Sequence, residues 1–533
     1  MPVFYRGYRS NEVGIYAQDD WRIAPRLTLN LGVRWEYFGP PTNFQHTATA
    51  GDSNFYFGSP VTPFPGGSNP FMPVNNPLYA QESTGAFRVV TNNIWNKDLN
   101  NFAPRVGFSW DVTGKQKFVV RGGFGIYYDR MYNNIFENIR FNPPFYCACT
   151  IGVLQNGQAA GGIATPGLQT VPFTATSNFA ALSTKARPRH MDQNMVAPYY
   201  EQFSYGVQYQ LAKDFALEAN YVGTLGRKLL GVRNLNTFDG RTSCPNPGAN
   251  PYPPGSPCAA AGFPFGFSTR RPNTTIGSDN FRSAAFSSNY DGLNLTLRKR
   301  FSNGLQFNAN YTYSKALDQI SDVFRAKGDT SPTDPMNLHL DYGPSDFDVR
   351  HRFVTSYNYD LPFLKTNRWL GGWSLNGIFS WQTGASIALL DSIDSPNGTG
   401  NVNQRPSFIG TGSVTSAINT NVSPAHGYIK AADFATVSCP ATVNGGIWCN
   451  STLGRGALHG PHFVSLDFGV DKAFKITESS KLTFQANFFD LANHPNFSNP
   501  NGNVIDPAFG NSQSTFGDQG GHRVTQLALR FDF

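Results

Sequence analysis

Charged residues are scarce in this chain. Asp, Glu, Lys and Arg make up 14% of its 533 residues, against roughly a quarter in typical soluble domains. No apolar stretch approaches the roughly 18 to 20 residues that a membrane-spanning helix requires. Aromatic residues reach 14%, which excludes a mainly disordered chain, and 53 Gly with 37 Pro argue against a helical one. A large all-β protein remains, either soluble or a membrane barrel whose apolar residues alternate with polar ones.

Cysteine is also rare. The six cysteines form three pairs close in sequence: Cys147 with Cys149, Cys244 with Cys258, and Cys439 with Cys449. All lie in stretches rich in Gly, Pro or Asn, so we expect local disulfides in an oxidising compartment for the two wider pairs. The first pair, with one residue between its members, could bridge only with strain. No basic-then-apolar segment follows Met1, so we expect any export signal to lie outside this chain.

The net charge of +7 could indicate a nucleic-acid partner. The sequence has no dense basic cluster, only single Arg and Lys residues spread along the predicted strands and turns. Dispersed charge on a wet face is therefore the favoured interpretation, and no nucleic-acid partner is expected.

Strict alternation of apolar and polar residues is the most informative pattern. From Arg26 the chain reads RLTLNLGVRWEYF, with Leu, Val, Trp and Tyr on one face of a predicted strand and Arg, Thr, Asn and Glu on the other. The same pattern recurs at 105–112, 117–128, 202–209, 293–298, 305–313 and 482–488. We expect about thirteen strands, the first near Glu12 to Arg22 and the last near Arg523 to Phe533.

The predicted connections alternate in length. Short links near residues 24–25, 113–116, 212–214, 302–303, 362–368 and 476–480 alternate with long irregular stretches. A bacterial outer-membrane barrel has such tight periplasmic turns and long external loops, whereas a soluble sandwich has no reason for them. The predicted strand from Trp369 to Thr383 places Trp369 and Trp381 at the distance expected of two interfacial aromatic girdles. Single-chain barrels have an even strand number, so we expect this chain to begin partway through a barrel that is incomplete at the N-terminus.

Several of these segments resemble the barrel of TonB-dependent outer-membrane receptors. They are YAQDDWRIAPRLTLNLGVRWEYF (Tyr16 to Phe38) and NFAPRVGFSWD (Asn101 to Asp111). Four others resemble the Oar-like branch: YDGLNLTLRKRFSNGLQFNANYTYSKALD (Tyr290 to Asp318), GPSDFDVRHRFVTSYNYDLPF (Gly343 to Phe363), LTFQANFFDLANHPNFSNP (Leu482 to Pro500) and the closing RVTQLALRFDF.

The resemblance implies uptake of a scarce solute across the outer membrane of a Gram-negative bacterium, driven by TonB. It also implies an N-terminal plug that TonB grips, and often a carboxypeptidase-regulatory-like domain before it. Neither is recognisable here, so residues 1–533 are expected to be a partial barrel domain that meets TonB only through the missing N-terminal region. The solute, whether siderophore, glycan, peptide or vitamin, stays open.

The C-terminus matches the last-strand signal that the barrel-assembly machinery recognises. Phe533 is aromatic and shares a predicted strand face with Phe531 and Leu529. We therefore expect these three residues to form the assembly signal.

Other motifs predict no catalytic, metal or cofactor site. The glycines at 122, 123 and 125 lie inside a strand pattern rather than before a helix, so a phosphate loop is disfavoured. The stretch DSIDSPNGTGN (Asp391 to Asn401) lacks the spacing of a calcium loop. His351, His459 and His462 offer no complete ligand set, and we expect them in the lumen or in loops. Nothing predicts an enzyme.

Two alternatives remain at this stage. A passive porin-like channel or an adhesin barrel would need no plug. A soluble secreted β-protein that binds carbohydrate would explain the strands and aromatic residues without a membrane.

Overall fold

The computed structural model describes residues 8–43, 56–57, 88–89, 95–137, 189–192, 194–234, 280–323, 332–335, 337–362, 367, 370–391, 404–419, 422, 427–437, 451–477, 479–516 and 522–533. One large sheet of fifteen strands dominates this part of the chain. Among the same residues no helix is long and apolar enough to cross a membrane. The expected all-β class is confirmed.

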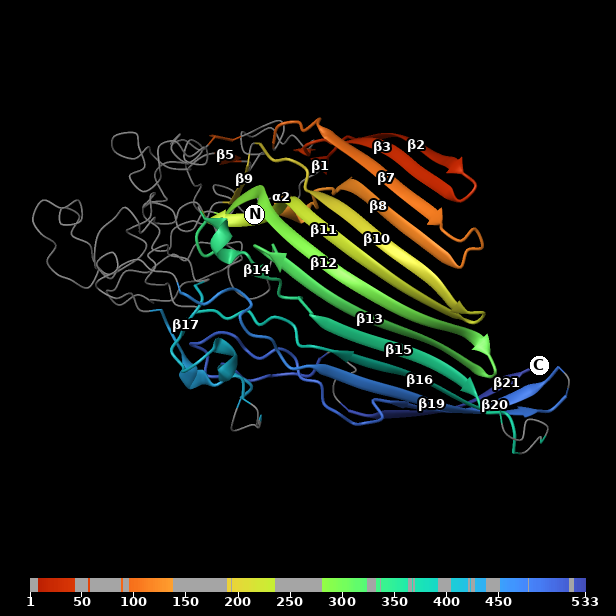
Figure 1. Cartoon of the computed structure of the whole chain (residues 1–533). Helices are drawn as coiled ribbons and strands as arrows, with labels where there is room; N and C mark the ends of the chain where they lie inside the picture. The colour runs from red at the N-terminus through yellow and green to blue at the C-terminus, as the bar shows by residue number, and fades with distance from the viewer. Residues whose placement is uncertain are drawn as a thin grey trace, which may run out of the picture.

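Thirteen strands of the sheet follow one another as antiparallel neighbours. In order they are β2 (Glu12–Ala24), β3 (Leu27–Phe38), β7 (Asn101–Asp111), β8 (Phe118–Tyr128), β10 (Tyr199–Ala212), β11 (Phe215–Asn234), β12 (Asn280–Ser302), β13 (Leu305–Asp318), β15 (His351–Asp360), β16 (Trp373–Gln382), β19 (Phe463–Lys475), β20 (Lys481–Phe489) and β21 (Val524–Asp532). The expected number of strands is therefore confirmed. The two remaining strands, β9 (Arg189–Met191) and β14 (Gly343–Pro344), pair with β12 and β13. The sheet curls so that β2 and β21 form its two edges, and within the described residues these edges do not pair with each other (Figure 1).

The connections alternate in length as the sequence predicts. Residues 25–26, 112–117, 213–214 and 303–304 join successive strands at one end of the sheet (Figure 1). The strands that they do not join, such as β3 and β7 or β8 and β10, are separated by many more residues in the sequence. The tight β12–β13 turn shows how local chemistry closes these hairpins. Asn303 and Gly304 both have positive φ, 52° and 81°, as a two-residue Asn-Gly hairpin turn requires.

Side chains alternate between two faces, and the convex face carries the apolar set. Trp21 is 54% exposed, Phe102 57%, Tyr205 59% and Leu529 68%. No second sheet or helix among the described residues covers this belt (Figure 1). An apolar face this exposed over a whole sheet fits lipid and not water.

One expected strand boundary is wrong. Strand β16 begins at Trp373 rather than Trp369, and Trp369 itself lies outside the described residues. The aromatic separation on this strand is therefore that between Trp373 and Trp381, eight residues or roughly 26 Å along the strand. With a tilt of about 40° the rise is roughly 20 Å, slightly less than the usual apolar band of about 25 Å.

Two small apolar clusters lie at the long-loop end. The first comprises Trp95, Met131, Ile135, Phe136, Met191, Met195 and Leu230, around the helical turn α2 (Asn134–Glu137). The second, which we call the outer layer, comprises Ile387, Leu389, Ala417, Ile429, Phe434, Leu453, Leu458 and Phe509. It includes the short pair β17 (Ser407–Phe408) with β18 (Phe434–Ala435) and the 3-10 turns Val414–Ala417 and Ala431–Asp433. Four further two-residue strands stand outside the large sheet: β1 (Tyr8–Arg9) pairs with β4 (Thr42–Asn43), and β5 (Tyr56–Phe57) pairs with β6 (Arg88–Val89).

Candidate functional site

The concave face of the sheet, which we call the lumen face, carries the polar side chains. Cross-strand register arranges them in rows, because residues paired across neighbouring strands point to the same side. One such row runs Arg22, Thr28, Ser109, Arg121 across β2, β3, β7 and β8, and it continues through Gly206, Asn220, Asn294 and Thr312 to Arg352. Within it Thr312 donates a 2.8 Å hydrogen bond to the Asn294 side-chain oxygen. The lumen face is thus polar, as the alternation predicts.

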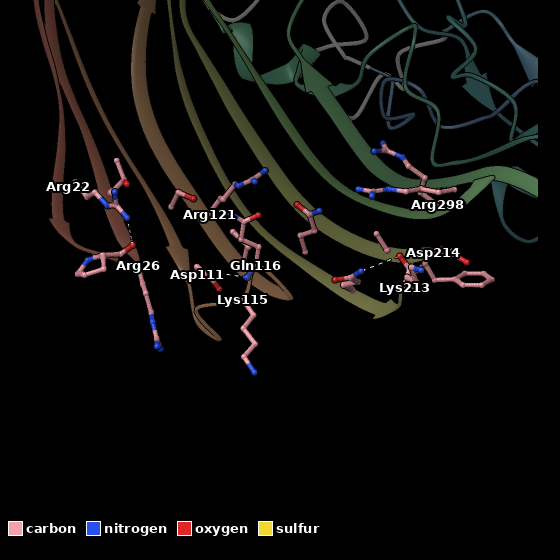
Figure 2. Close-up of a pocket in the computed structure, with 18 residues that line it drawn as sticks. Arg22, Arg26, Asp111, Lys115, Gln116, Arg121, Lys213, Asp214 and Arg298 are labelled. Atoms are coloured by element: carbon pink, nitrogen blue, oxygen red, sulfur yellow. Dashed lines mark hydrogen bonds between the residues drawn. The ribbon is translucent and has the colours of Figure 1, made fainter. Parts of the chain in front are cut away.

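A cavity of about 690 Å³ lies on this face at the short-turn end (Figure 2). We call it the basic cavity, because seven of its lining side chains are cationic: Arg22, Arg26, Lys115, Arg121, Lys213, Arg298 and Arg300. Only Asp111 and Asp214 are acidic, and Thr28, Ser109, Gln116, Gln208 and Gln210 add polar groups. The cavity therefore has a large excess of positive charge.

Strands and turns contribute these cations differently. Arg22, Arg121 and Arg298 stand on β2, β8 and β12, around the hollow (Figure 2). These strands are three spacings apart in the sheet order, which is roughly 14 Å. Arg298 also lies four residues closer to the short turns than Asn294, which shares the row of Arg22 and Arg121. Arg26, Lys115 and Lys213 lie in three successive short connections. Each of the three hairpin turns that border the cavity therefore carries a cation.

The two carboxylates leave a formal charge of +5 on the lining, seven cations less two acids. Asp111 is engaged by its own turn, where its carboxylate accepts hydrogen bonds of 2.9 Å from the Gly114 amide and 2.9 Å from the Gln116 amide. Arg22 donates from Nη2 to the Pro25 carbonyl oxygen at 2.8 Å. None of the seven cations forms an ion pair with another residue in the described part of the chain. The guanidinium and ammonium groups are therefore available to an anion.

A second cavity of about 480 Å³ lies higher on the same wall. Its floor is partly bare backbone, because Gly107 and Gly123 pair directly across β7 and β8. The Arg105 guanidinium carbon lies 4.5 Å from the centroid of the Tyr127 ring at the same cavity. The two cavities share strands β2 to β11, so the lumen face is hollowed from its middle to the short-turn end.

Two lysines mark the boundary of the convex face at the short-turn end. Lys299 and Lys472 lie on the lipid-facing side, but their ammonium groups turn back into hairpins. Lys299 Nζ donates to the Ser302 and Leu305 carbonyl oxygens at 2.9 and 3.0 Å, and Lys472 Nζ donates to the Gly371 carbonyl oxygen. The stem of each lysine stays with apolar neighbours while its charge reaches the polar end, which is typical of an interfacial lysine.

Two arginines connect the outer layer to other segments: Arg405 to the 3-10 turn Leu338–Asp341, and Arg455 to Asp318 at the end of β13. Arg405 Nη1 lies 2.6 Å from Asp341 Oδ1, and the two side chains are only 10% and 9% exposed. Arg455 donates to the Asp318 carboxylate and, at 2.7 Å, to the Ser321 hydroxyl. These contacts join segments 64 and 137 residues apart in sequence, so the long-loop end has a folded framework.

Asp348 belongs to the same framework. Its carboxylate accepts the Ala316 amide at 2.6 Å and lies 3.2 Å from Arg350 Nη2. Burial raises the pKa of Asp348, but the nearby His459 side chain, the Ala316 amide and Arg350 outweigh burial, so the pKa lies below its ordinary value.

The predicted assembly residues lie on the edge strand β21 and just beyond it. Leu529, Phe531 and Phe533 are 68%, 52% and 95% exposed, and the two phenylalanine rings lie 6.1 Å apart. The structure thus places them together on one exposed face. Cys244, Cys258, Cys439 and Cys449, like Cys147 and Cys149, lie outside the described residues.

The remaining motifs fall as follows. The glycines at 122, 123 and 125 are inside strand β8, as expected. Asp391 is fully buried and its carboxylate accepts the Val437 amide at 2.8 Å, which is a structural role. No group of three potential metal-ligating side chains occurs in the part of the chain that the structure describes.

The expectation for His351 is wrong. It pairs with Tyr313, and its Nδ1 lies 2.8 Å from the Tyr311 hydroxyl, on the lipid-facing side rather than in the lumen. Its place as the first residue of β15, in phase with Phe353 and Tyr357, explains this orientation.

The basic cavity contradicts the prediction that positive charge is merely dispersed. Its cations are single residues far apart in sequence, so no local window reveals them. A usable signal was nevertheless present: Arg22, Arg121 and Arg298 all occupy polar-face positions a few residues from a short connection.

Comparison with known proteins supports an outer-membrane barrel. A family model described as an outer membrane beta barrel domain matches residues 2–526. No curated protein matches the chain. Among solved structures, it is similar to the outer membrane transporter YddB from Escherichia coli, with 11% identity and a TM-score of 0.46, over 98% of this chain and 45% of that one.

Two further solved structures show similar values. The ferripyoverdine receptor of Pseudomonas aeruginosa shares 10% identity at a TM-score of 0.44, over 99% of this chain and 39% of that one. The FrpB iron transporter from Neisseria meningitidis shares 10% identity at a TM-score of 0.41, over 99% of this chain and 46% of that one. The chain spans less than half the length of each of these proteins.

Proposed function

Because this chain belongs to the outer membrane beta barrel domain family, we propose that it takes up a small solute across the outer membrane of a Gram-negative bacterium. The solute would be captured at the long-loop end and would pass along the lumen face to the short-turn end. The observation that carries this proposal is the hollowed polar wall, with cavities of about 480 and 690 Å³ on one continuous set of strands.

We propose further that uptake is driven by TonB. This part rests on the resemblance of the segments at 16–38, 101–111, 290–318, 343–363 and 482–500 to TonB-dependent receptors. A passive channel is the alternative, since an open polar lumen would conduct without energy.

The test is uptake by cells that carry the full protein in their outer membrane. Radiolabelled trisaccharides, short peptides and ferric siderophores are offered to cells with and without the protein, and each uptake is repeated with a proton uncoupler. Driven transport predicts uptake that needs the protein and stops with the uncoupler. Uptake that needs the protein but persists with the uncoupler would support a passive channel, and no protein-dependent uptake of any class would refute the proposal.

Two structural expectations join this proposal. We propose that Phe533, Phe531 and Leu529 form the signal for the assembly machinery, since they lie together on one exposed face. The expected disulfides, Cys244 with Cys258 and Cys439 with Cys449, are proposed on sequence spacing alone. Electrophoresis of the full protein with and without reductant, after alkylation, would test the disulfides.

A further inference from the structure

We propose that the basic cavity is a binding site for small polyanions that carry carboxylate or phosphate groups, so that the solute of this protein is anionic. The inference rests on the proposed uptake function and specifies its substrate class.

The charge of the cavity is the first argument. Seven cationic and two acidic residues line the cavity, and Asp111 accepts two amide hydrogen bonds in its own turn. Arg26 and Lys115 extend past the turns (Figure 2), whereas Arg22, Arg121 and Arg298 stand on the wall of the cavity. A hydrogen bond between a cation and an anion is stronger than one between neutral groups, and a guanidinium group can bind a carboxylate or phosphate with two parallel hydrogen bonds. An anion would supply the missing partners.

The spacing of the arginines is the second argument. Arg22 and Arg121 lie in one cross-strand row, three strands apart, or roughly 14 Å at the backbone. Arg298 lies three strands further on, four residues closer to the short turns than Asn294, which shares that row. Between the first two, Thr28 and Ser109 add hydroxyl donors in the same cross-strand row. Since separate arginines share one hollow, a ligand with several anionic groups gains more than a ligand with one.

The orientation of the arginines excludes a lipid headgroup as the ligand. Arg22, Arg121 and Arg298 each follow an apolar, lipid-facing neighbour: Trp21, Val120 and Leu297. Because side chains alternate along a strand, the three arginines point away from the bilayer. The volume of about 690 Å³ is that of a typical small-ligand pocket, which favours a soluble small anion over a protein segment.

The experiment measures binding by calorimetry to the full protein, purified in an uncharged detergent. Citrate and pyrophosphate are the anionic probes, one for each chemistry, and triethyl citrate is the neutral counterpart of citrate. We compare the native protein with Arg121→Gln, Arg298→Gln and the control Arg530→Gln. Arg530 lies on β21, outside the cavity, and its Nε is 2.7 Å from Asp532 Oδ1.

We expect citrate or pyrophosphate, or both, to bind, and triethyl citrate not to bind. Each cavity substitution should weaken binding about fivefold, because an exposed arginine contributes less than a desolvated one. Arg530→Gln should change affinity by less than about twofold. Higher salt should weaken binding of the anions, since dissolved ions screen the attraction between the anion and the solvent-exposed cations of the cavity.

Four results would overturn the proposal. The first two are no binding of either citrate or pyrophosphate, and equal binding of citrate and its neutral ester. The third is no effect of either cavity substitution. The fourth is tight binding of hexaglutamate without binding of citrate or pyrophosphate, which would instead indicate an acidic protein segment. Heat-modifiable gel mobility confirms that each variant is folded. If anions fail to bind while cells still show protein-dependent uptake, only the anionic substrate class fails; if anions bind but uptake is absent, the uptake function fails.

Discussion

Strand β10 offers a direct test of which face of the sheet meets lipid. Tyr199, its first residue, and Tyr209, three residues before its end, lie on the convex face, ten residues or roughly 34 Å apart along the strand. A tilt of about 40° reduces this to roughly 26 Å of height, close to the apolar band of an outer-membrane barrel. The midpoint falls at Ser204, on the lumen face, and at its neighbour Tyr205, which is 59% exposed on the convex face.

We predict opposite outcomes for an arginine at these two adjacent positions. Tyr205→Arg should lower the free energy of unfolding by about 2–4 kcal/mol relative to Tyr205→Leu, because the charge would lie at the bilayer midplane. Ser204→Arg should cost less than about 1 kcal/mol, since a charge in a wet lumen keeps its hydration. The leucine reference separates the effect of the charge from the loss of the tyrosine ring.

The assay is reversible urea unfolding from lipid vesicles, followed by tryptophan fluorescence and gel mobility. A difference of about 3 kcal/mol corresponds to a change of more than a hundredfold in the unfolding equilibrium. Equal costs at the two positions would mean that neither face is selectively in lipid. A larger cost at Ser204 would mean that the two faces have been assigned the wrong way round. Either result would refute the reasoning.

Three further predictions concern the ends of the sheet. Arg405→Met should raise protease cleavage within the outer layer about a hundredfold while the sheet stays folded. The substitution leaves Asp341 buried without its 2.6 Å partner, which costs about 3 kcal/mol of local stability. Unchanged cleavage would contradict this prediction. Phe533→Ala should reduce the fraction of protein in the outer membrane severalfold in cells but leave refolding in detergent unchanged, and equal losses in both assays would argue against a recognition signal. The folded-state pKa of Asp348 lies below its ordinary value, so its stabilising contribution is present above the ordinary carboxyl range near about pH 4 and is lost as pH falls through the folded pKa. Outer-layer cleavage should therefore rise on acidification, and Asp348→Asn should flatten that rise.

Much of the sheet could be predicted from local pattern. A period of two assigns each residue of a strand to one face without reference to any other strand, so the convex belt around Trp21, Tyr205 and Leu529 was visible in the sequence. Turn chemistry is equally local, and Asn303 with Gly304 closes its hairpin where the short link was expected. The alternation of short and long connections then followed from the number of residues between successive predicted strands.

Contacts between distant segments could not be predicted in this way. The Arg405–Asp341 and Arg455–Asp318 pairs join residues 64 and 137 positions apart, and no local window contains both partners. The same reason hid the basic cavity. Arg22, Arg121 and Arg298 look like isolated charges along the chain and become neighbours on one wall only when strand order and register are set.

The sequence alone therefore determined an all-β, two-faced sheet with one apolar side and its turns at one end, because these properties depend on neighbours one or two residues away. The tertiary structure alone decided where positive charge accumulates, how the outer layer is held, and that His351 faces the lipid side. Those properties depend on which strands lie side by side and in which register, and that is settled by the whole sheet at once.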